Sequence, residues 1–149
     1  MNAHRGIILA ARKGTRMSNF RGPKSTLELK KNLKIMRNIL NNFRKNYINE
    51  IFIVTGFKSK VFKKYEAKKI INKNWKKTNM FKSLLCADKI LNKFPCVVSY
   101  SDIVYDHSAI KLSASALPSR IEPLEVTFTV FTPASKRLSE IAPPLIKSS

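Results

Sequence analysis

The sequence predicts an α/β fold in which helices cover both faces of an open, mostly parallel sheet. Two observations carry this prediction. Short, continuous apolar runs are typical of strands buried on both faces, and they alternate with segments whose apolar residues recur every three or four positions, as in helices. The alternation continues to about residue 106. Strands that alternate with helices favour right-handed crossovers and therefore parallel neighbours.

Four segments are expected to be strands, and three segments between them are expected to be helices. The strands are expected at residues 7–11, 50–55, 68–72 and 95–100, and the helices at 31–46, 59–65 and 79–91. The first helix has an apolar stripe that would pack on the sheet, formed by Leu33, Met36, Ile39, Leu40 and Phe43. The last helix has a similar stripe, formed by Met80, Leu84, Leu85, Ala87 and Leu91.

The chain is strongly basic, with a net charge of +20 over 149 residues. Its length corresponds to about one domain. The charge indicates either a polyanionic partner or the coding bias that enriches Lys, Asn, Ile and Phe together. Because the lysines are scattered and no RNA- or DNA-binding pattern is present, we favour coding bias and do not expect nucleic acid as a partner.

The two cysteines, Cys86 and Cys96, have no metal-binding or CxxC spacing. Their apolar surroundings predict two buried, reduced thiols in a cytoplasmic protein. No apolar run approaches the roughly 20 residues of a membrane span, so no membrane partner is expected.

The composition changes near residue 113. Residues 113–149 contain five of the seven prolines and carry almost none of the net charge. The alternation of Leu124, Val126, Phe128 and Val130 with polar residues predicts one half-buried strand, and the rest of this Pro- and Ser-containing tail is expected to be irregular. We therefore divide the chain into residues 1–112 and a tail at 113–149.

A basic loop follows the first expected strand. It contains Gly14, Arg16 and Lys24, residue types that suit phosphate because glycine exposes backbone N–H groups and the side chains are cationic. The pattern is neither GxxxxGK[ST] nor GxGxxG, so a solvated basic loop explains it equally well. This loop, Gly56 and Asp102 all follow the carboxyl ends of expected strands, where ligands of parallel sheets bind.

Four segments in order resemble the sugar-phosphate-type nucleotidyltransferases, a MobA-like NTP transferase family. They are IILAARKGTRM with the downstream PK, INEIFIVTGFKSKVF, INKNWKKTNMFKSLLCAD and VVSYSDIVY. The nearest branch is the small cytidylyltransferases that act on phosphocholine or aminoethylphosphonate. The resemblance covers about residues 5–112 and implies a Rossmann-like, three-layer sheet that is incomplete at its C-terminus.

The resemblance also implies roles for individual residues. The backbone of Leu9, Ala10 and Ala11 would hold the base and ribose, and Gly14 and Thr15 would wrap the triphosphate. Arg16 and Lys24 would act as catalytic cations that neutralise the phosphates. Asn79 and Ser83 would recognise the pyrimidine, and Asp102 would bind Mg²⁺. From the residues alone, Asn79 could equally be a helix N-cap and Asp102 could cap a turn.

The chain departs from the family pattern at two places. The family signature L-A-A-G-x-G-x-R has glycine where this chain has Arg12. If that position requires a positive φ, arginine carries backbone strain, and its side chain can crowd the nucleotide. Nothing after Ser113 resembles the family, so the sequence indicates a truncated domain whose exposed sheet edge could self-associate.

The resemblance implies Mg²⁺-dependent transfer of a nucleotidyl group from CTP, or another NTP, to a small phosphorylated alcohol or phosphonate, with release of pyrophosphate. Two alternatives remain open at this point. The two departures from the family pattern are also consistent with an inactive nucleotide-binding remnant. The net charge of +20 is also consistent with a basic nucleic-acid-binding module.

Overall fold

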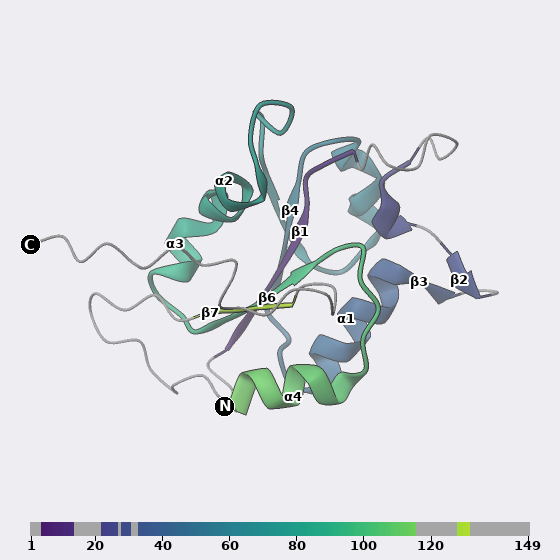
Figure 1. Cartoon of the computed structure of the whole chain (residues 1–149), viewed down its shortest axis with the longest axis vertical. Helices are drawn as coiled ribbons and strands as arrows, with labels where there is room; N and C mark the ends of the chain where they lie inside the picture. Colours follow the sequence, from purple (N-terminus) through teal and green to yellow (C-terminus); the bar gives the residue numbers. More distant parts are fainter. Residues whose placement is uncertain (1–3, 14–21, 27, 31–32, 116–127, 132–149) are drawn as a thin grey trace, which may run out of the picture.

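A five-stranded, all-parallel sheet forms the centre of the computed structural model, which describes residues 4–13, 22–26, 28–30, 33–115 and 128–131 (Figure 1). Its spatial order is β5-β4-β1-β6-β7. The strands are β1 (Arg5–Ala10), β4 (Ile51–Thr55), β5 (Lys68–Ile71), β6 (Cys96–Tyr100) and β7 (Phe128–Phe131). In register, Ile8 of β1 lies between Ile53 of β4 and Ser99 of β6.

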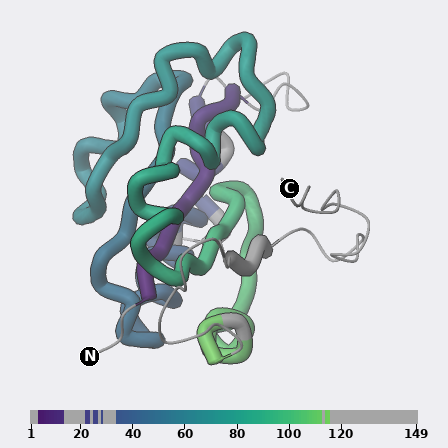
Figure 2. The backbone as a smooth tube through the Cα atoms, turned by 90° about the vertical axis from the view of Figure 1, so that its left-hand side faces the viewer, coloured from purple at the N-terminus to yellow at the C-terminus, as the bar shows by residue number. Residues whose placement is uncertain are grey.

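Helices lie on both faces of this sheet, which confirms the predicted fold class. One face carries α1 (Ile35–Lys45), the 3₁₀ helix η2 (Ser59–Lys64) and α4 (His107–Ser115). The opposite face carries α2 (Met80–Leu84), the 3₁₀ helix η3 (Leu85–Ala87) and α3 (Asp88–Leu91). Figure 2 shows the segment from α2 to α3 crossing in front of the sheet.

The core divides into two apolar layers because side chains alternate across a strand. Ile8 and Ala10 of β1 face α1, where Met36, Ile39 and Phe43 are buried. The alternate side chains of β1, Ile7 and Leu9, face α2 and α3 and pack with Leu84, Ala87 and Leu91. Burial on both faces explains why β1, β4 and β6 are continuous apolar runs in the sequence.

The first predicted helix begins later than expected. A small antiparallel pair, β2 (Glu28–Lys30) and β3 (Leu33–Lys34), precedes it, so the expected start at residue 31 is wrong. Leu33, which the periodicity placed on the helix stripe, belongs to β3. The other four members of the stripe are buried on α1.

The segment predicted as one helix over 79–91 is divided by the 3₁₀ turn η3. Cys86 lies in this turn and is exposed, so the prediction that both thiols are buried is wrong for Cys86. Cys96 is buried in β6, and loss of solvation there raises the pKa of its thiol to about 12.

Two elements follow β6. The helix α4 was not predicted; it buries Ile110 against α1, and the Asp106 side chain accepts a hydrogen bond from the Ser108 N–H at 2.8 Å near its start. β7 pairs in parallel with β6, with Val98 opposite Val130. It overlaps the strand predicted from the 124–130 alternation at residues 128–130 and continues to Phe131, and the first four predicted residues are outside the described part of the chain.

Glu50 joins two basic side chains at the amino end of the sheet. It pairs with Arg5 and accepts a hydrogen bond from Lys68 at 2.5 Å, and this bond, together with the nearby positive charges, holds the pKa of Glu50 below its usual 4.5. A depressed carboxyl pKa contributes stability above pH 4.5 that is lost as pH falls through the folded-state value. We expect Glu50→Gln to lose less stability than wild type between about pH 6 and about pH 3, measured by urea unfolding. An equal loss in both proteins would contradict this role.

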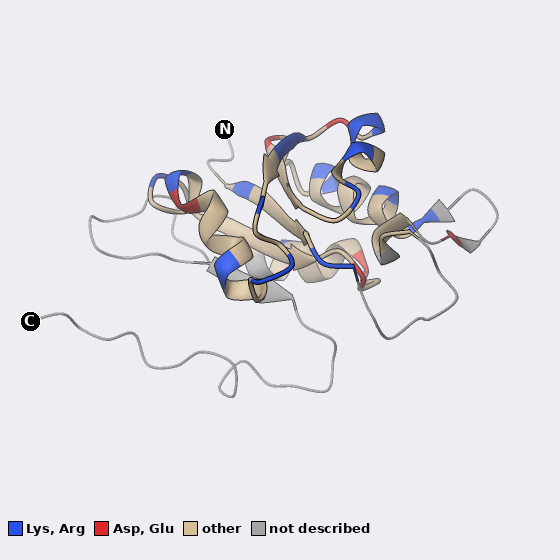
Figure 3. Cartoon of the chain, turned by 90° about the horizontal axis from the view of Figure 1, so that it is seen from above, with Lys and Arg blue, Asp and Glu red and all other residues tan. Residues whose placement is uncertain are grey.

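Lys and Arg dominate the described surface, and Asp and Glu occur at few places (Figure 3). No helix in the described ranges has the length and apolar character needed to cross a bilayer.

Candidate functional site

The carboxyl ends of β1, β4 and β6 meet at one edge of the sheet, and hydrogen bonds tie the loops that follow them together. The Phe57 N–H, just after β4, donates to the Ala11 carbonyl at 2.8 Å. The Ser101 N–H, just after β6, donates to the Leu9 carbonyl at 3.2 Å. These bonds extend the sheet past its strands, so the three loops form one continuous rim.

The residues expected to hold a base and ribose form the end of β1. Leu9, Ala10 and Ala11 are each at most 3% exposed, so their side chains are not available to a ligand. Two of their carbonyls already accept bonds from the neighbouring loops. The part of the candidate site at the end of β1 is therefore rigid backbone and not flexible side chains.

The rest of the first loop is described in part. Gly14, Thr15 and Arg16 lie outside the described residues. Lys24 begins the 3₁₀ helix η1 (Lys24–Thr26), whose turn is closed by the Thr26 N–H and hydroxyl, both donating to the Pro23 carbonyl at 3.0 and 2.7 Å. The side chain of Lys24 is outside the described part of the structure.

Arg12 is exposed at the end of β1, and its backbone is not strained. Among the described non-glycine residues, positive φ angles occur only at Tyr47 and Lys58. The strain that a positive φ would impose on Arg12 is therefore absent. The other expectation, that the Arg12 side chain can crowd a nucleotide, concerns an exposed cation next to the exposed Lys13 in the sequence.

An aromatic pair stands beside this loop. The rings of Phe57 and Trp75 lie 5.3 Å apart at an interplanar angle of 58°. The Lys13 and Lys58 Nζ atoms lie 5.8 and 5.6 Å from the Phe57 ring centroid. The Lys76 Nζ atom lies 5.7 Å from the Trp75 ring centroid. The rim is thus lined by cations held against aromatic faces.

At Gly56 the turn after β4 approaches both the end of β1 and the loop that carries Trp75 most closely. A Cβ added there would lie 2.5 Å from the Trp75 Cβ and 2.7 Å from the Ala11 carbonyl oxygen. Only glycine leaves room for both contacts. The turn after β4 therefore fixes the spacing between the end of β1 and the loop that carries Trp75.

Asn79 and Ser83 lie together at the start of α2, but only one of them is exposed. Asn79 is the N-cap, and its side-chain oxygen accepts from the Lys82 N–H at 2.8 Å, so the capping alternative is confirmed. Its side chain is exposed. Ser83 is fully buried, and its hydroxyl donates to the Asn79 carbonyl at 3.1 Å.

Asn72, which the sequence analysis did not single out, links these residues to β5. It is 3% exposed, and its amide donates to the Thr78 hydroxyl at 2.8 Å and to the Ser83 hydroxyl at 3.0 Å. The only sequence signal was an asparagine directly after the short strand KKII, a position where asparagine is common in turns.

Asp102 follows β6 in a turn at the same rim. Its side chain is exposed, and it makes no hydrogen bond or ion pair within the described part of the chain. Its position is fixed from both sides. The Ser101 N–H binds the end of β1 before it, and the hydroxyl of the partly buried Tyr105 donates to Ser99 at 2.9 Å after it.

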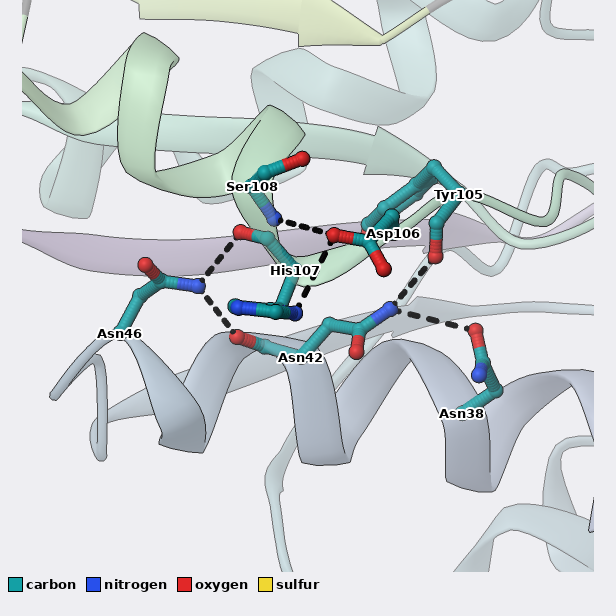
Figure 4. Close-up of polar contacts among 7 residues, drawn as sticks. All are labelled: Asn38, Asn42, Asn46, Tyr105, Asp106, His107 and Ser108. Atoms are coloured by element: carbon teal, nitrogen blue, oxygen red, sulfur yellow. Dashed lines mark hydrogen bonds and ion pairs between the residues drawn. The ribbon is translucent and has the colours of Figure 1, made fainter.

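Two asparagines, Asn42 of α1 and Asn46 at the C-cap of α1, anchor the segment that follows Asp102 (Figure 4). The Asn42 amide donates to the Tyr105 carbonyl at 2.7 Å and to the Asn38 side chain at 3.2 Å. The Asn46 amide donates to the carbonyls of His107 and Asn42, both at 2.9 Å. Their spacing of four along α1 was the available sequence signal, since residues four apart share a helix face.

The chemistry of the described residues bears on the metal role expected of Asp102. No group of three or more His, Cys, Asp or Glu side chains gathers among them. The exposed carboxylate of Asp102, which has no partner among the described residues, nevertheless suits Mg²⁺, which usually binds one or two carboxylates together with substrate phosphates and several waters. A hydrated ion carried by a triphosphate therefore fits this carboxylate.

A shallow hollow of about 380 Å³ lies next to the rim. It is lined by residues in or just before η1, β3 and η2, namely Gly22, Pro23, Thr26, Lys34, Lys58, Val61 and Lys64. The three lysines make it attractive to an anion. A second hollow, of about 420 Å³, lies at the amino end near Asn49 and Lys68, away from the rim.

Comparisons with known proteins agree with this geometry. The chain is 34% identical over 123 residues to the CTP:phosphoglutamine cytidylyltransferase of Campylobacter jejuni, an alignment that covers 74% of this chain and 47% of that protein. The solved CTP:phosphocholine cytidylyltransferase of Streptococcus pneumoniae superposes with a TM-score of 0.56 and 25% identity, over 60% of this chain and 41% of the other. The chain thus spans about half the length of these relatives.

The family comparison covers most of the chain. The model of the MobA-like NTP transferase domain matches residues 6–133, which includes β1, the rim, α4 and β7. The match extends past residue 112, where the resemblance in the sequence alone ended. The parallel sheet, its rim of loops and this match together place the chain in the family of MobA-like NTP transferase domains.

Proposed function

We propose that the rim binds CTP with Mg²⁺ and supports transfer of the cytidylyl group to a small acceptor that carries a phosphate or phosphonate, with release of pyrophosphate. The observation that carries this proposal is the convergence at one sheet edge of the β1 backbone, the Lys13 and Lys58 cations and the exposed Asp102 carboxylate. Both relatives named above are CTP-dependent and act on phosphorylated acceptors by their names.

The proposed roles follow the chemistry of each group. The backbone of Leu9–Ala11 holds the base and ribose, and the exposed amide of Asn79 recognises the pyrimidine. Ser83, being buried, acts through the Asn79 backbone that it holds. Asp102 receives the metal that accompanies the phosphates.

Charge neutralisation is the main chemical task of such a site. In nucleotidyl transfer, negative charge builds on the attacked phosphate and on the departing pyrophosphate, so positioning and cations supply most of the catalysis. Gly14 and Thr15 are proposed to wrap the triphosphate, and Arg16 and Lys24 to neutralise it. No nucleophilic side chain is required, because the acceptor phosphate oxygen attacks directly.

Arg12 provides the test of whether this loop still accepts a nucleotide. Because its backbone is unstrained, Arg12→Gly relieves no strain and changes only a side chain. We expect wild type to bind CTP with Mg²⁺, and Arg12→Gly to bind within about threefold of wild type, which is less than 1 kcal/mol. Isothermal titration calorimetry measures both, with the exposed Arg37→Gly on α1 as the control for loss of a surface arginine.

The same titration separates the alternatives. If only Arg12→Gly binds CTP, the arginine side chain blocks the site. If CTP binds but no acceptor gives pyrophosphate release, the chain is a nucleotide-binding protein without turnover. If binding does not discriminate between bases and falls steeply with salt, the protein binds polyanions and the proposal is wrong.

A further inference from the structure

Every hydrogen-bonding group of Asn72 has a partner. Its N–H donates to the Thr55 carbonyl at 2.8 Å, and its own carbonyl accepts from the Trp75 N–H at 3.3 Å. The side-chain amide donates to Thr78 and Ser83, and the side-chain oxygen accepts from the Asn74 N–H at 3.0 Å. A buried group with this many partners fixes the conformation of what surrounds it.

Hydrogen bonds hold the loop between β5 and α2 against Asn72. Thr78 is bonded to Asn72 through its hydroxyl, and its N–H donates to the Asn74 carbonyl at 3.1 Å. Trp75, between them, packs against Gly56 and Phe57 at the rim. Asn72 therefore determines where Trp75 meets the ends of β1 and β4.

Two consecutive hydrogen bonds connect Asn72 to Asn79 through the Ser83 hydroxyl. The Ser83 hydroxyl accepts a hydrogen from the Asn72 amide, which leaves its own hydrogen free to donate to the Asn79 carbonyl. The amide of Asn72 thus sets the direction of the Ser83 hydroxyl. The Ser83 N–H donates to the same Asn79 carbonyl at 3.0 Å, so two bonds hold the N-cap in place.

We propose that Asn72 is a positioning residue that fixes Asn79 and Trp75 at the rim and thereby sets the affinity and base preference of the nucleotide site. The inference rests on the proposed function for its ligand, but its geometry is independent of that function. Asparagine is required because the site needs two donors and one acceptor on a short side chain. Aspartate keeps the shape and removes both donors.

Asn72→Asp is the direct test on the full chain. The Ser83 hydroxyl then donates to either the new carboxylate or the Asn79 carbonyl, but not to both, so the N-cap loosens. We expect CTP affinity to fall at least tenfold and the ratio of CTP to UTP affinity to fall with it. Amide hydrogen exchange at Lys82 and Ser83 should accelerate at least tenfold, since both N–H groups bind Asn79.

Two further variants separate positioning from general stability. Thr78→Ser keeps the hydroxyl that Asn72 binds and should retain wild-type affinity, whereas Thr78→Val should lose it. Leu91→Ala removes a buried side chain from the same layer, so it should lower the melting temperature without altering the ratio of CTP to UTP affinity. An altered ratio in Leu91→Ala that matches Asn72→Asp would overturn the proposal.

The outcomes distinguish this inference from the proposed function. If wild type binds CTP and Asn72→Asp has the same base preference, the positioning role is wrong and the proposed function stands. If wild type binds no nucleotide, the proposed function is wrong, and hydrogen exchange still decides whether Asn72 holds Asn79. Unchanged exchange at Lys82 and Ser83 in Asn72→Asp overturns the inference in either case.

Discussion

Asp102→Asn is expected to abolish the Mg²⁺-dependent part of CTP binding. The carboxylate is exposed and unpaired among the described residues, so its charge is available to a metal that arrives with the triphosphate. The amide keeps the shape and removes the charge. We expect affinity for CTP with Mg²⁺ to fall at least about tenfold, or 1.4 kcal/mol, and affinity for CTP without metal to change little. Calorimetric titration with and without Mg²⁺ measures both.

Asp88→Asn is the matched control. Asp88 is also exposed, but it begins α3 on one face of the sheet instead of at the rim. The two variants change the net charge equally, so a loss in both would indicate only long-range electrostatics. Because Asp102 is exposed, its variant should also keep the wild-type melting temperature. Unchanged Mg²⁺ dependence in Asp102→Asn would remove this residue from the metal site.

Gly56→Ala is expected to have the largest effect on stability. The added methyl group would lie 2.5 Å from Trp75 and 2.7 Å from the backbone oxygen of Ala11, and neither neighbour can move without displacing the rim. Overpacking of this kind costs about 3 kcal/mol, which corresponds to about 10 °C in melting temperature for a chain of this size. Thermal unfolding followed by circular dichroism measures the change.

Gly6→Ala offers a comparison in the same sheet. There the new methyl group would meet the Phe43 ring at 3.1 Å, and a side chain can shift by a few tenths of an ångström. Alanine is also preferred to glycine within a strand. We expect Gly6→Ala to cost less than about 1 kcal/mol. If Gly56→Ala were as stable as Gly6→Ala, the close approach at the rim would not constrain the structure.

The strands were predictable because their burial is visible in the residues themselves. A strand covered on both faces has to be apolar throughout, and β1, β4 and β6 are short apolar runs with no competing helical period. The helix α4 was missed because its boundary lies where the composition changes. Its first residue is held by a polar side chain about sixty residues away, since the Asn46 amide at the C-cap of α1 donates to the His107 carbonyl, and periodicity carries no information about such pairs.

The candidate site was predictable in its location and less so in its contacts. Loops after parallel strands meet at one edge, which placed Asp102 beside the end of β1 without further information. The burial of Ser83 could not be predicted, because it depends on the Asn72 amide reaching the hydroxyl across eleven positions of the sequence. The expected strain at Arg12 depended on a backbone angle that residue identity alone does not determine.

Mapping of CTP by nuclear magnetic resonance tests the central claim most directly. Addition of CTP with Mg²⁺ to the full ¹⁵N-labelled chain should shift the amide resonances of residues 9–13, 56–57 and 100–102 at the rim and of residues 72–79 in the adjoining loop between β5 and α2. Amides at the amino end of the sheet, around residues 49–51 and 67–68, should stay unchanged. Shifts confined to the amino end, or no shifts in the folded protein, would contradict a nucleotide site at the carboxyl edge.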